Sequence, residues 1–302
     1  MVYQSFLSPI HEYSNLPFRL LCQQYGADAA CVPMVSATTI ARRPDKVSLV
    51  DTHAVEKNVG VQLVGNEPGD FGKAAKIIEK RFPFITWLNI NCGCPSAQTI
   101  ECGGGSALLD CPEVMVRILE DMKKSTELPV TVKIRVKDGF EGTNKICEKL
   151  EKAGADFIVV HARTAAQGYS GKADWRIIKK LNEAVDVPLV GNGDIKTASQ
   201  GNDLVKEGYC DFFMVGRAAM ENPMLFSDKK PVSMKCRKGL LEEYLALYRK
   251  YIGEPDKNDL KLKAVNFISG VQDAASIRDS ICRAKTVEGV MGVIERSVDY
   301  EA

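Results

Sequence analysis

The chain has 302 residues, of which 45% are hydrophobic and 26% are charged. This composition is ordinary for a folded protein of one or two domains, and it excludes an intrinsically disordered chain. The formal net charge of +1 does not exclude a nucleic-acid partner, because a near-neutral total can hide a local basic surface.

The sequence begins Met1-Val2-Tyr3-Gln4-Ser5-Phe6, without a basic region followed by an apolar stretch. No secretory signal is therefore expected, and no uncharged apolar run approaches the roughly 20 residues that a membrane helix needs. We expect a cytoplasmic protein that does not contact a membrane. In that compartment at least seven of the ten cysteines should be reduced, buried thiols.

From the start of the chain to about Phe226, short apolar strands alternate with amphipathic helices. The predicted strands are 5–8, 29–33, 59–63, 85–89, 130–134, 157–160, 189–191 and 212–215. The predicted helices between them are 18–24, 71–80, 113–125, 143–153, 174–184 and 198–207. Eight apolar strands separated by helices indicate parallel β/α units with both faces of the sheet covered.

A doubly wound open sheet would give a similar alternation with fewer strands. Eight strands, over a length close to the about 250 residues typical of the fold, favour an α/β architecture of the (β/α)8 TIM-barrel type. Polar clusters also follow many of the strands, among them Asn89-Ile90-Asn91, His161-Ala162-Arg163 and Asn192-Gly193-Asp194. In a barrel these positions meet at the C-terminal mouth, where active sites lie.

The pattern changes after Phe226. The segment Ser227-Asp228-Lys229-Lys230-Pro231 is typical of a linker, and no strand is expected beyond it. Helices are predicted at 240–252, 260–270 and 274–284, with a shorter fourth at 286–296. We therefore expect two domains, a catalytic TIM barrel of residues 1–226 and a small all-helical domain of residues 227–302.

The strongest local signal is the segment Asn89-Ile90-Asn91-Cys92-Gly93-Cys94-Pro95-Ser96, followed by Gly103-Gly104-Gly105-Ser106. An apolar strand ends in asparagines, and a tight Gly-Cys-Pro turn then places a thiol at the barrel mouth. Proline fixes φ and removes a hydrogen-bond donor, so the turn is stiff. The structural alternative is a buried cysteine without a catalytic role.

A metal site is a further alternative, with Cys92 and Cys94 as ligands together with Cys102 and Cys111. The spacing differs from that of zinc-binding pairs, in which two to four residues separate the cysteines, and no histidine is nearby. No metal is therefore expected.

The order of several motifs resembles that of the tRNA-dihydrouridine synthases. Besides the turn at Cys94, the resemblance covers Ser8-Pro9-Ile10, Pro17-Phe18-Arg19, Gln62, Lys133, His161-Ala162-Arg163-Thr164, Gly191-Asn192-Gly193-Asp194-Ile195 and Gly216-Arg217. Ser8 and Ile10 replace the alanine and methionine that are commoner in the family, and Asn89 stands where many members carry aspartate. The helical region matches only loosely.

The resemblance implies an FMN-dependent oxidoreductase that reduces the C5=C6 bond of uridine in tRNA, with NADPH or NADH as reductant. Cys94 would protonate C5, and reduced FMN would deliver hydride to C6. Lys133 would stabilise the negative charge that reduction places near N1 and O2 of the flavin. The implied FMN contacts are Ser8, Pro9, Ile10, Gln62, Lys133, His161, Asn192, Gly193, Asp194, Gly216 and Arg217.

For the tRNA, Asn91 and Arg163 are the expected contacts in the barrel. Candidate cations outside it are Lys229, Lys230, Lys235, Arg237, Lys238, Lys261, Lys263, Arg278, Arg283 and Lys285. Of these we favour Arg278, Arg283 and Lys285, which we expect on one helical stretch. Reduction requires the target base to be drawn out of its stack into the pocket. No motif indicates a stable protein partner.

Two other functions remain open from the sequence. A small-molecule flavin dehydrogenase of the dihydroorotate or dihydropyrimidine type would share the barrel and the flavin, but the Gly-Cys-Pro turn and the helical region disfavour it. A non-catalytic RNA-binding barrel would have no need of both Lys133 and Cys94 at one mouth.

Overall fold

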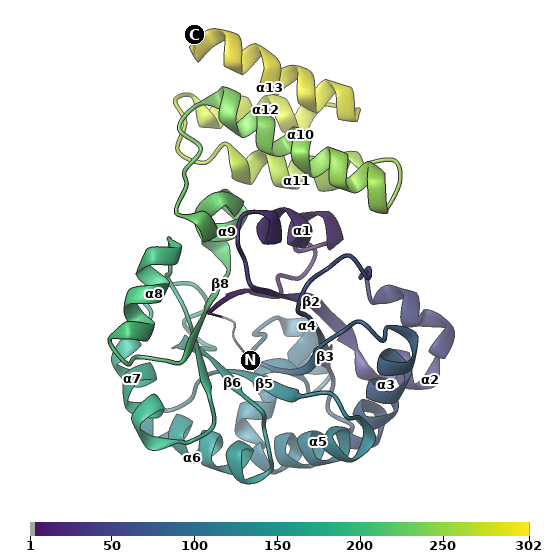
Figure 1. Ribbon diagram of the computed structural model, residues 1–302, viewed down its shortest axis with the longest axis vertical. Coiled ribbons are helices and arrows are strands. Elements are labelled where there is room, and N and C mark those ends of the chain that lie inside the picture. Colours follow the sequence, from purple (N-terminus) through teal and green to yellow (C-terminus); the bar gives the residue numbers. More distant parts are fainter. Residues whose placement is uncertain (1–3, 302) are drawn as a thin grey trace.

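The computed structural model describes residues 4–301, with side chains up to residue 298; residues 1–3 and 302, at the outer ends of the two predicted domains, lie outside the described residues. Eight parallel strands pair in sequence order, and the last pairs with the first to close a barrel (Figure 1). The strands are β1 (Ser5–Leu7), β2 (Ala29–Ser36), β3 (Val59–Val64), β4 (Trp87–Cys92), β5 (Val130–Val136), β6 (Ile158–Thr164), β7 (Leu189–Asn192) and β8 (Phe212–Val215). The predicted TIM barrel is confirmed.

The helices between the strands form the outer ring of the barrel (Figure 1). All six predicted helices are present, as α1 (Leu16–Gln24), α3 (Pro68–Arg81), α5 (Pro112–Ser125), α6 (Gly139–Lys152), α7 (Trp175–Ala184) and α8 (Ala198–Lys206). Both α3 and α5 begin with a proline and carry basic residues in the last turn. These residues suit a first turn that lacks N–H partners and the negative end of the helix dipole.

Short helices that the sequence did not indicate lie in the loops. They are α2 (Ala37–Arg42), α4 (Ala97–Glu101), α9 (Arg217–Glu221) and the 3-10 turns Pro44–Leu49, Gly105–Asp110 and Pro223–Ser227. Strand β4 begins at Trp87, which pairs with Gly60, rather than at residue 85. It continues to Cys92, so the loop that carries Cys94 starts at Gly93.

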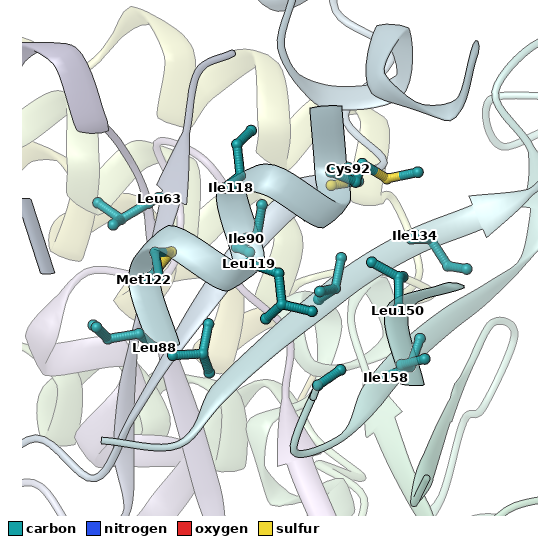
Figure 2. Packing of buried hydrophobic residues seen from close by; sticks show 14 of the residues in the cluster. Leu63, Leu88, Ile90, Cys92, Ile118, Leu119, Met122, Ile134, Leu150 and Ile158 are labelled. Carbon is teal, nitrogen blue, oxygen red and sulfur yellow. The ribbon is translucent and has the colours of Figure 1, made fainter. Parts of the chain in front are cut away.

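Apolar side chains fill both faces of the sheet. Outside the barrel, residues of β3–β6 share one hydrophobic cluster with residues of α5 and α6 (Figure 2). Inside, the rings of Phe6, Trp87 and Phe157 gather near the N-terminal ends of the strands, with centroids 5.4–6.0 Å apart. A Cβ atom on Gly60 would lie 2.3 Å from the Trp87 ring, so only glycine fits there. These rings close the barrel at one end and leave the C-terminal mouth as the open end.

The predicted helical region is present as α10 (Met234–Tyr251), α11 (Lys257–Phe267), α12 (Ala274–Arg283) and α13 (Val287–Glu301), which lie beside α1 and α9 (Figure 1). The prediction of a shorter fourth helix is wrong, because α13 has 15 residues against 11 in α11 and 10 in α12. Its apolar pattern continues from Val290 to Val298, which packs on the same cluster as α10. Within residues 4–301, no helix combines the length and the apolar character needed to cross a bilayer.

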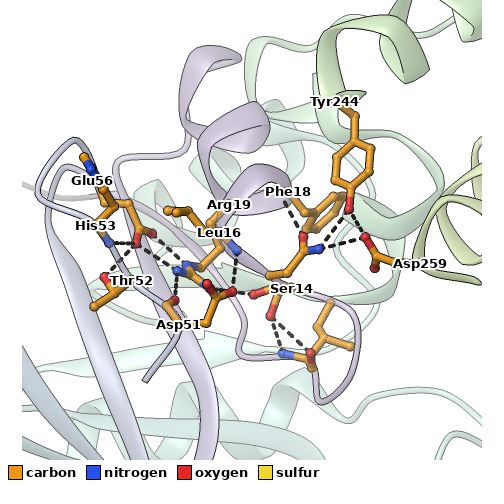
Figure 3. A network of polar contacts seen from close by, with 12 residues as sticks. Ser14, Leu16, Phe18, Arg19, Asp51, Thr52, His53, Glu56, Tyr244 and Asp259 are labelled. Atoms are coloured by element: carbon orange, nitrogen blue, oxygen red, sulfur yellow. Dashed lines mark hydrogen bonds and ion pairs between the residues drawn. The ribbon is translucent and has the colours of Figure 1, made fainter. Parts of the chain in front are cut away.

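A polar network joins α1 to the loop before β3 and to the helical region (Figure 3). Arg19 forms a two-pronged ion pair with Glu56, at 2.7 and 2.8 Å, and both side chains are fully buried. Asn15 donates to Tyr244 and Asp259, at 2.8 and 2.9 Å. These contacts fix the helical region against the barrel.

Lys263 is part of this junction, so its inclusion among the candidate RNA contacts was wrong. Its side chain is fully buried and pairs with Asp259 at 2.8 Å. The ammonium group also lies 4.2 Å from the centre of the Tyr13 ring. A buried lysine needs such partners, because burial without them would be costly.

The prediction of seven or more buried cysteines is also wrong. All ten are free thiols, but only Cys22, Cys31, Cys92, Cys147 and Cys210 are buried. Cys94 and Cys236 are half-buried, and Cys102, Cys111 and Cys282 are exposed. Cys92 packs in the outer hydrophobic cluster, so it does not share the surroundings of Cys94.

Candidate active site

A cavity of about 1170 Å³ opens at the C-terminal mouth of the barrel, at the end opposite the aromatic rings. Its walls include Cys94, Asn91 and Arg163. They also include every residue predicted to contact FMN, namely Ser8, Pro9, Ile10, Gln62, Lys133, His161, Asn192, Gly193, Asp194, Gly216 and Arg217. The closure of the barrel thus brings together residues that are spread over more than 200 positions of the sequence.

The cavity is strongly basic. Eight lysine and arginine residues line it, against the two acidic residues Asp194 and Glu221. The basic residues are Lys133, Arg135, Arg163, Lys172, Lys196, Arg217, Lys230 and Arg237. A chain with a net charge of only +1 therefore concentrates its positive charge at this mouth, where it attracts an anionic ligand.

The side chain of Asn91 shapes the turn that carries the thiol. Its Oδ1 accepts hydrogen bonds from the backbone N–H groups of Gly93 at 3.1 Å and Cys94 at 2.9 Å. Its amide nitrogen donates to Gln62 at 2.8 Å and faces the sulfur of Met34 at 3.5 Å. Because the amide is used within the fold, we interpret Asn91 as a positioning residue of the turn.

A chain of amides continues from Gln62 into the barrel. Gln62 donates to Asn89 at 2.7 Å, and Asn89 donates to Thr131 at 2.8 Å. The hydroxyl of Thr131 in turn donates to the carbonyl of Leu88. Asn89 must act here as both acceptor and donor, which an ionised aspartate could not do. The asparagine that departs from the family pattern therefore has a physical reason in this chain.

The glycines that follow the cysteine turn pack directly beneath it. Ser106 donates its backbone N–H to the carbonyl of Cys94 at 2.9 Å. Gly105 has φ +59, and a Cβ atom there would lie 2.5 Å from the same carbonyl. Glycine is required at this position both for its conformation and for the close approach.

Arg135 is a site residue for which the sequence predicted no role. Its guanidinium donates to the carbonyls of Gly93 at 2.8 Å, Thr164 at 3.0 Å and Gly168 at 2.9 Å. It thus ties the cysteine turn to the loop after β6. The sequence did contain an indication that Arg135 belongs to the site. It lies two positions after Lys133 on β5, and side chains at that spacing point to the same face of a strand.

The thiol of Cys94 is half-buried and has two hydroxyl neighbours. Burial opposes its ionisation, but hydrogen bonds with Ser96 and Thr99 and the positive charge of Arg135 outweigh that effect and lower its pKa. A thiol with a lowered pKa gives up its proton more readily, which suits a proton donor.

Lys133 lies in the middle of β5 and lines the cavity. Burial and the positive charge of Arg135 lower its pKa to about 8. Among residues 4–301 no acceptor forms a hydrogen bond or ion pair with its ammonium group. Such a group is suited to an electron-rich ligand in the cavity.

His161 is held neutral. Burial, together with nearby positive charges, lowers its pKa to about 2. These charges belong to Lys133, Arg135, Arg163 and Arg217. At neutral pH the imidazole can therefore form hydrogen bonds with a ligand without adding to the positive charge of the cavity.

The neutral His161 predicts an acid-sensitive fold. Because its pKa is lower in the folded than in the unfolded state, only the unfolded chain binds a proton at this residue between about pH 6.5 and 2. The free energy of unfolding should fall with pH in that window, by about 2 kcal/mol between pH 6.5 and 4.5 from this residue alone. Urea unfolding at both pH values should show a smaller loss in His161→Gln. Equal losses of unfolding free energy in the two proteins would contradict a neutral His161 in the folded protein.

Asp194 links two arginines on the opposite side of the cavity. Its carboxylate pairs with Arg163 at 2.7 Å and with Arg217 at 3.1 Å. Burial raises its pKa, but the N–H of Ala173 and these arginines outweigh burial and lower it. Arg163 is 2% exposed, and its Nη1 has no hydrogen-bond partner in the described chain. This wall thus holds a buried donor that a ligand could use.

Tyr169 is an exposed aromatic residue at the mouth that the sequence did not single out. It is 60% exposed, and the guanidinium of Arg217 lies 4.4 Å from the centre of its ring. Its loop position carries no periodic pattern, so no sequence signal distinguishes it from a surface tyrosine.

The basic residues of the helical region divide into two groups. Lys230 and Arg237 reach the cavity, whereas Arg278, Arg283 and Lys285 are not among its lining residues. Arg278 donates to the carbonyl of Val265 at 3.3 Å, and Arg283 pairs with Asp279 at 2.9 Å. The expectation that these three lie on one helix is wrong, because α12 ends at Arg283 and the backbone of Ala284 is no longer helical.

Comparisons with known proteins agree with this geometry. Residues 6–254 match the family described as "Dihydrouridine synthase (Dus)". A protein of Aquifex aeolicus named "Probable tRNA-dihydrouridine synthase" is 30% identical over 98% of this chain and 96% of its own length. A "tRNA-dihydrouridine(47) synthase [NAD(P)(+)]" of Coprinopsis cinerea is 35% identical over 75% of this chain, which spans only 36% of that protein.

Among solved structures, a 2-naphthoyl-CoA reductase complex superposes with a TM-score of 0.56. The match covers 74% of this chain and 49% of the other, at 10% sequence identity. At that identity the likeness shows a shared barrel fold and no more.

Proposed function

This chain belongs to the dihydrouridine synthase family, and we propose that it reduces the C5=C6 bond of a uridine in tRNA with bound FMN. One arrangement carries the proposal. A thiol with a lowered pKa and a lysine without an acceptor line the same basic cavity. A proton donor beside a site for an anionic, electron-rich ring is what such a reduction requires.

The cavity residues fit a flavin mononucleotide. The ammonium group of Lys133 and the Nη1 of Arg163 are donors without acceptors in the described chain. Lys133 would stabilise the negative charge of the reduced ring, and the turns at Asn192–Asp194 and Gly216–Arg217 would hold the phosphate. Ser8, Pro9, Ile10, Gln62 and His161 would complete the contacts. When bound, the flavin supplies the hydride that is added at C6.

Cys94 then completes the reduction. Its S–H bond breaks, the proton goes to C5 of the uracil ring, and the electron pair of the bond stays on sulfur. The turn holds the thiol at the cavity wall through Asn91 and Arg135. This fixed position is the reason why the proton reaches one carbon of a bound ring.

The lysines and arginines that line the cavity form a basic rim. This rim fits an RNA substrate better than a small neutral ring. The target uridine must leave its stack to reach Cys94, and the lysines and arginines of the rim would bind the phosphates on either side. Tyr169 offers an exposed ring for stacking with a base. A small ring with at most one carboxylate would contact few of the eight cations that line the cavity.

We propose residues 1–226 as the catalytic domain and residues 227–302 as the tRNA-binding domain. Lys230 and Arg237 extend the basic rim from the second domain, and Arg278, Arg283 and Lys285 would contact the tRNA further from the reacting base. NADPH or NADH would reduce the flavin. Free thiols and a tRNA substrate fit an enzyme of the cytoplasm.

Two measurements test the proposal. The visible absorption spectrum of the purified protein should show a bound flavin, and flavin released from it should chromatograph as FMN. Unmodified tRNA incubated with the protein and NADPH should gain dihydrouridine, detected by mass spectrometry of its nucleosides. A protein that binds FMN but turns over dihydroorotate and leaves tRNA unchanged would contradict the assigned substrate.

A further inference from the structure

Three side chains form a closed ring of hydrogen bonds at the tip of the cysteine turn. The thiol of Cys94 donates to the hydroxyl of Ser96 at 3.5 Å. Ser96 donates to the hydroxyl of Thr99 at 2.7 Å, and Thr99 donates back to the sulfur at 3.7 Å. Two hydroxyl groups therefore contact one thiol.

The ring connects the cavity to solvent. Cys94 lines the cavity, whereas neither Ser96 nor Thr99 does. Ser96 is exposed and Thr99 is 9% exposed. The two hydroxyls thus contact the thiol from outside the lining of the cavity, and one of them belongs to a residue that is exposed to bulk water.

This placement matters for the proposed reaction, on which the inference rests. Each turnover removes the proton of Cys94: the S–H bond breaks, and a C5–H bond forms with the electron pair that hydride addition at C6 leaves on the ring. A thiolate remains at the wall of a cavity that the RNA still covers. Before the next turnover it must be stabilised and then protonated again.

We propose that Ser96 and Thr99 are positioning residues of Cys94, whose hydroxyls stabilise the thiolate and return a proton to it from solvent by way of Ser96. In the return step the O–H bond of Ser96 breaks as the S–H bond forms, and a water molecule gives a proton to the serine oxygen. The hydroxide that is left enters bulk water. No reductant or oxidant takes part.

The electrostatic surroundings agree with this role. The charged groups that act on the thiol are Lys133 and Arg135, both on β5 and both cationic. Burial opposes ionisation, while Ser96, Thr99 and Arg135 favour it and prevail, so the pKa of Cys94 is lowered. The hydroxyls supply the part of this stabilisation that can also move a proton.

The first experiment titrates the thiol and needs no tRNA. Alkylation of the flavin-bound protein by iodoacetamide is followed against pH, with mass spectrometry of the peptide that carries Cys94. In Thr99→Val and in Ser96→Ala the midpoint should rise by about one pH unit, because each variant removes a hydrogen bond to a charged group. Thr99→Ser and Ser96→Thr keep a hydroxyl and should titrate like the natural protein.

Ser96 also caps α4, since its hydroxyl accepts from the backbone N–H of Thr99 at 3.3 Å. Ser36→Ala is a matched control, because Ser36 caps α2 in the same way at 3.1 Å but is not a lining residue of the cavity. Its midpoint should not move. Unchanged midpoints in both Thr99→Val and Ser96→Ala would overturn the inference.

The second experiment tests the return of the proton. With excess dithionite as reductant and excess unmodified tRNA, Ser96→Ala should form about one dihydrouridine per active site. It should then continue about a hundredfold more slowly than the natural protein, by loss of a proton-transfer group. A time course identical to that of the natural protein would overturn the relay. If the natural protein itself forms no dihydrouridine, the proposed function fails, and the titration still decides whether the hydroxyls stabilise the thiolate.

Discussion

Replacing Cys94 by alanine is expected to slow uridine reduction by a factor of about 10²–10⁴, the usual contribution of a positioned proton donor, while the flavin stays bound. The thiol lies on the turn after β4, whereas Lys133 and the glycine turns lie on other strands. The turn itself is held by Asn91 and Arg135 through backbone atoms of Gly93 and Cys94. Loss of the sulfur should therefore leave the cofactor contacts in place.

The measurement is a single turnover of the pre-reduced protein with unmodified tRNA, together with the ratio of flavin to protein absorbance. Cys102→Ala serves as the control, because Cys102 is an exposed thiol on the same segment and does not line the cavity. It should react at the rate of the natural protein. Full activity of Cys94→Ala would show that the thiol is not the proton donor.

Glu56→Gln is expected to lower the free energy of unfolding by about 3–5 kcal/mol, the usual cost of leaving one charge of a buried pair without its partner. Arg19 and Glu56 are both fully buried and pair through two hydrogen bonds (Figure 3). Glu56 also accepts from the hydroxyl of Thr52 at 2.7 Å. The variant would keep an amide oxygen at position 56 and the carbonyls of Ser14 and Asp51 as acceptors. The nearest carboxylate to the buried guanidinium would then be that of Asp51, which lies 4.0 Å away and is 44% exposed.

Urea unfolding monitored by circular dichroism measures this change. Asp45→Asn is the control, because Asp45 forms an exposed pair with Arg43, and its replacement should not change stability measurably. The double variant Arg19→Met/Glu56→Leu should be more stable than Glu56→Gln, since it removes both buried charges. A Glu56→Gln protein as stable as the natural one would show that the pair is not needed for folding.

The fold and most of the cavity could be predicted from the sequence. Strand and helix periodicities are local properties, and eight β/α units in order lead to a barrel whose strand ends meet at one mouth. Lys133 lies within a predicted apolar strand, whereas His161 and Asn192 follow one directly, so their convergence with Cys94 required no knowledge of packing. Their individual roles toward the flavin and the uridine stay predictions.

Other features depend on contacts between distant parts of the chain, and the tertiary structure alone decided them. Glu56 lies 37 positions from Arg19, and nothing in its surroundings along the chain marks it as a buried partner. The same holds for Lys263, a lysine of ordinary sequence context that proved to be buried against Tyr13.

For the basic residues of the helical region and for the thiol, the sequence likewise determined one part and the tertiary structure the other. Which of them reach the mouth depends on how α10–α13 pack on α1, so Lys230 and Arg237 could not be distinguished from Arg278 and Arg283 by composition. The sequence by itself determined that a thiol stands at the barrel mouth. Only the folded turn, with α4 beginning at Ala97, decided that Ser96 and Thr99 contact it, because hydrogen bonds between side chains depend on angles and distances that no periodicity encodes.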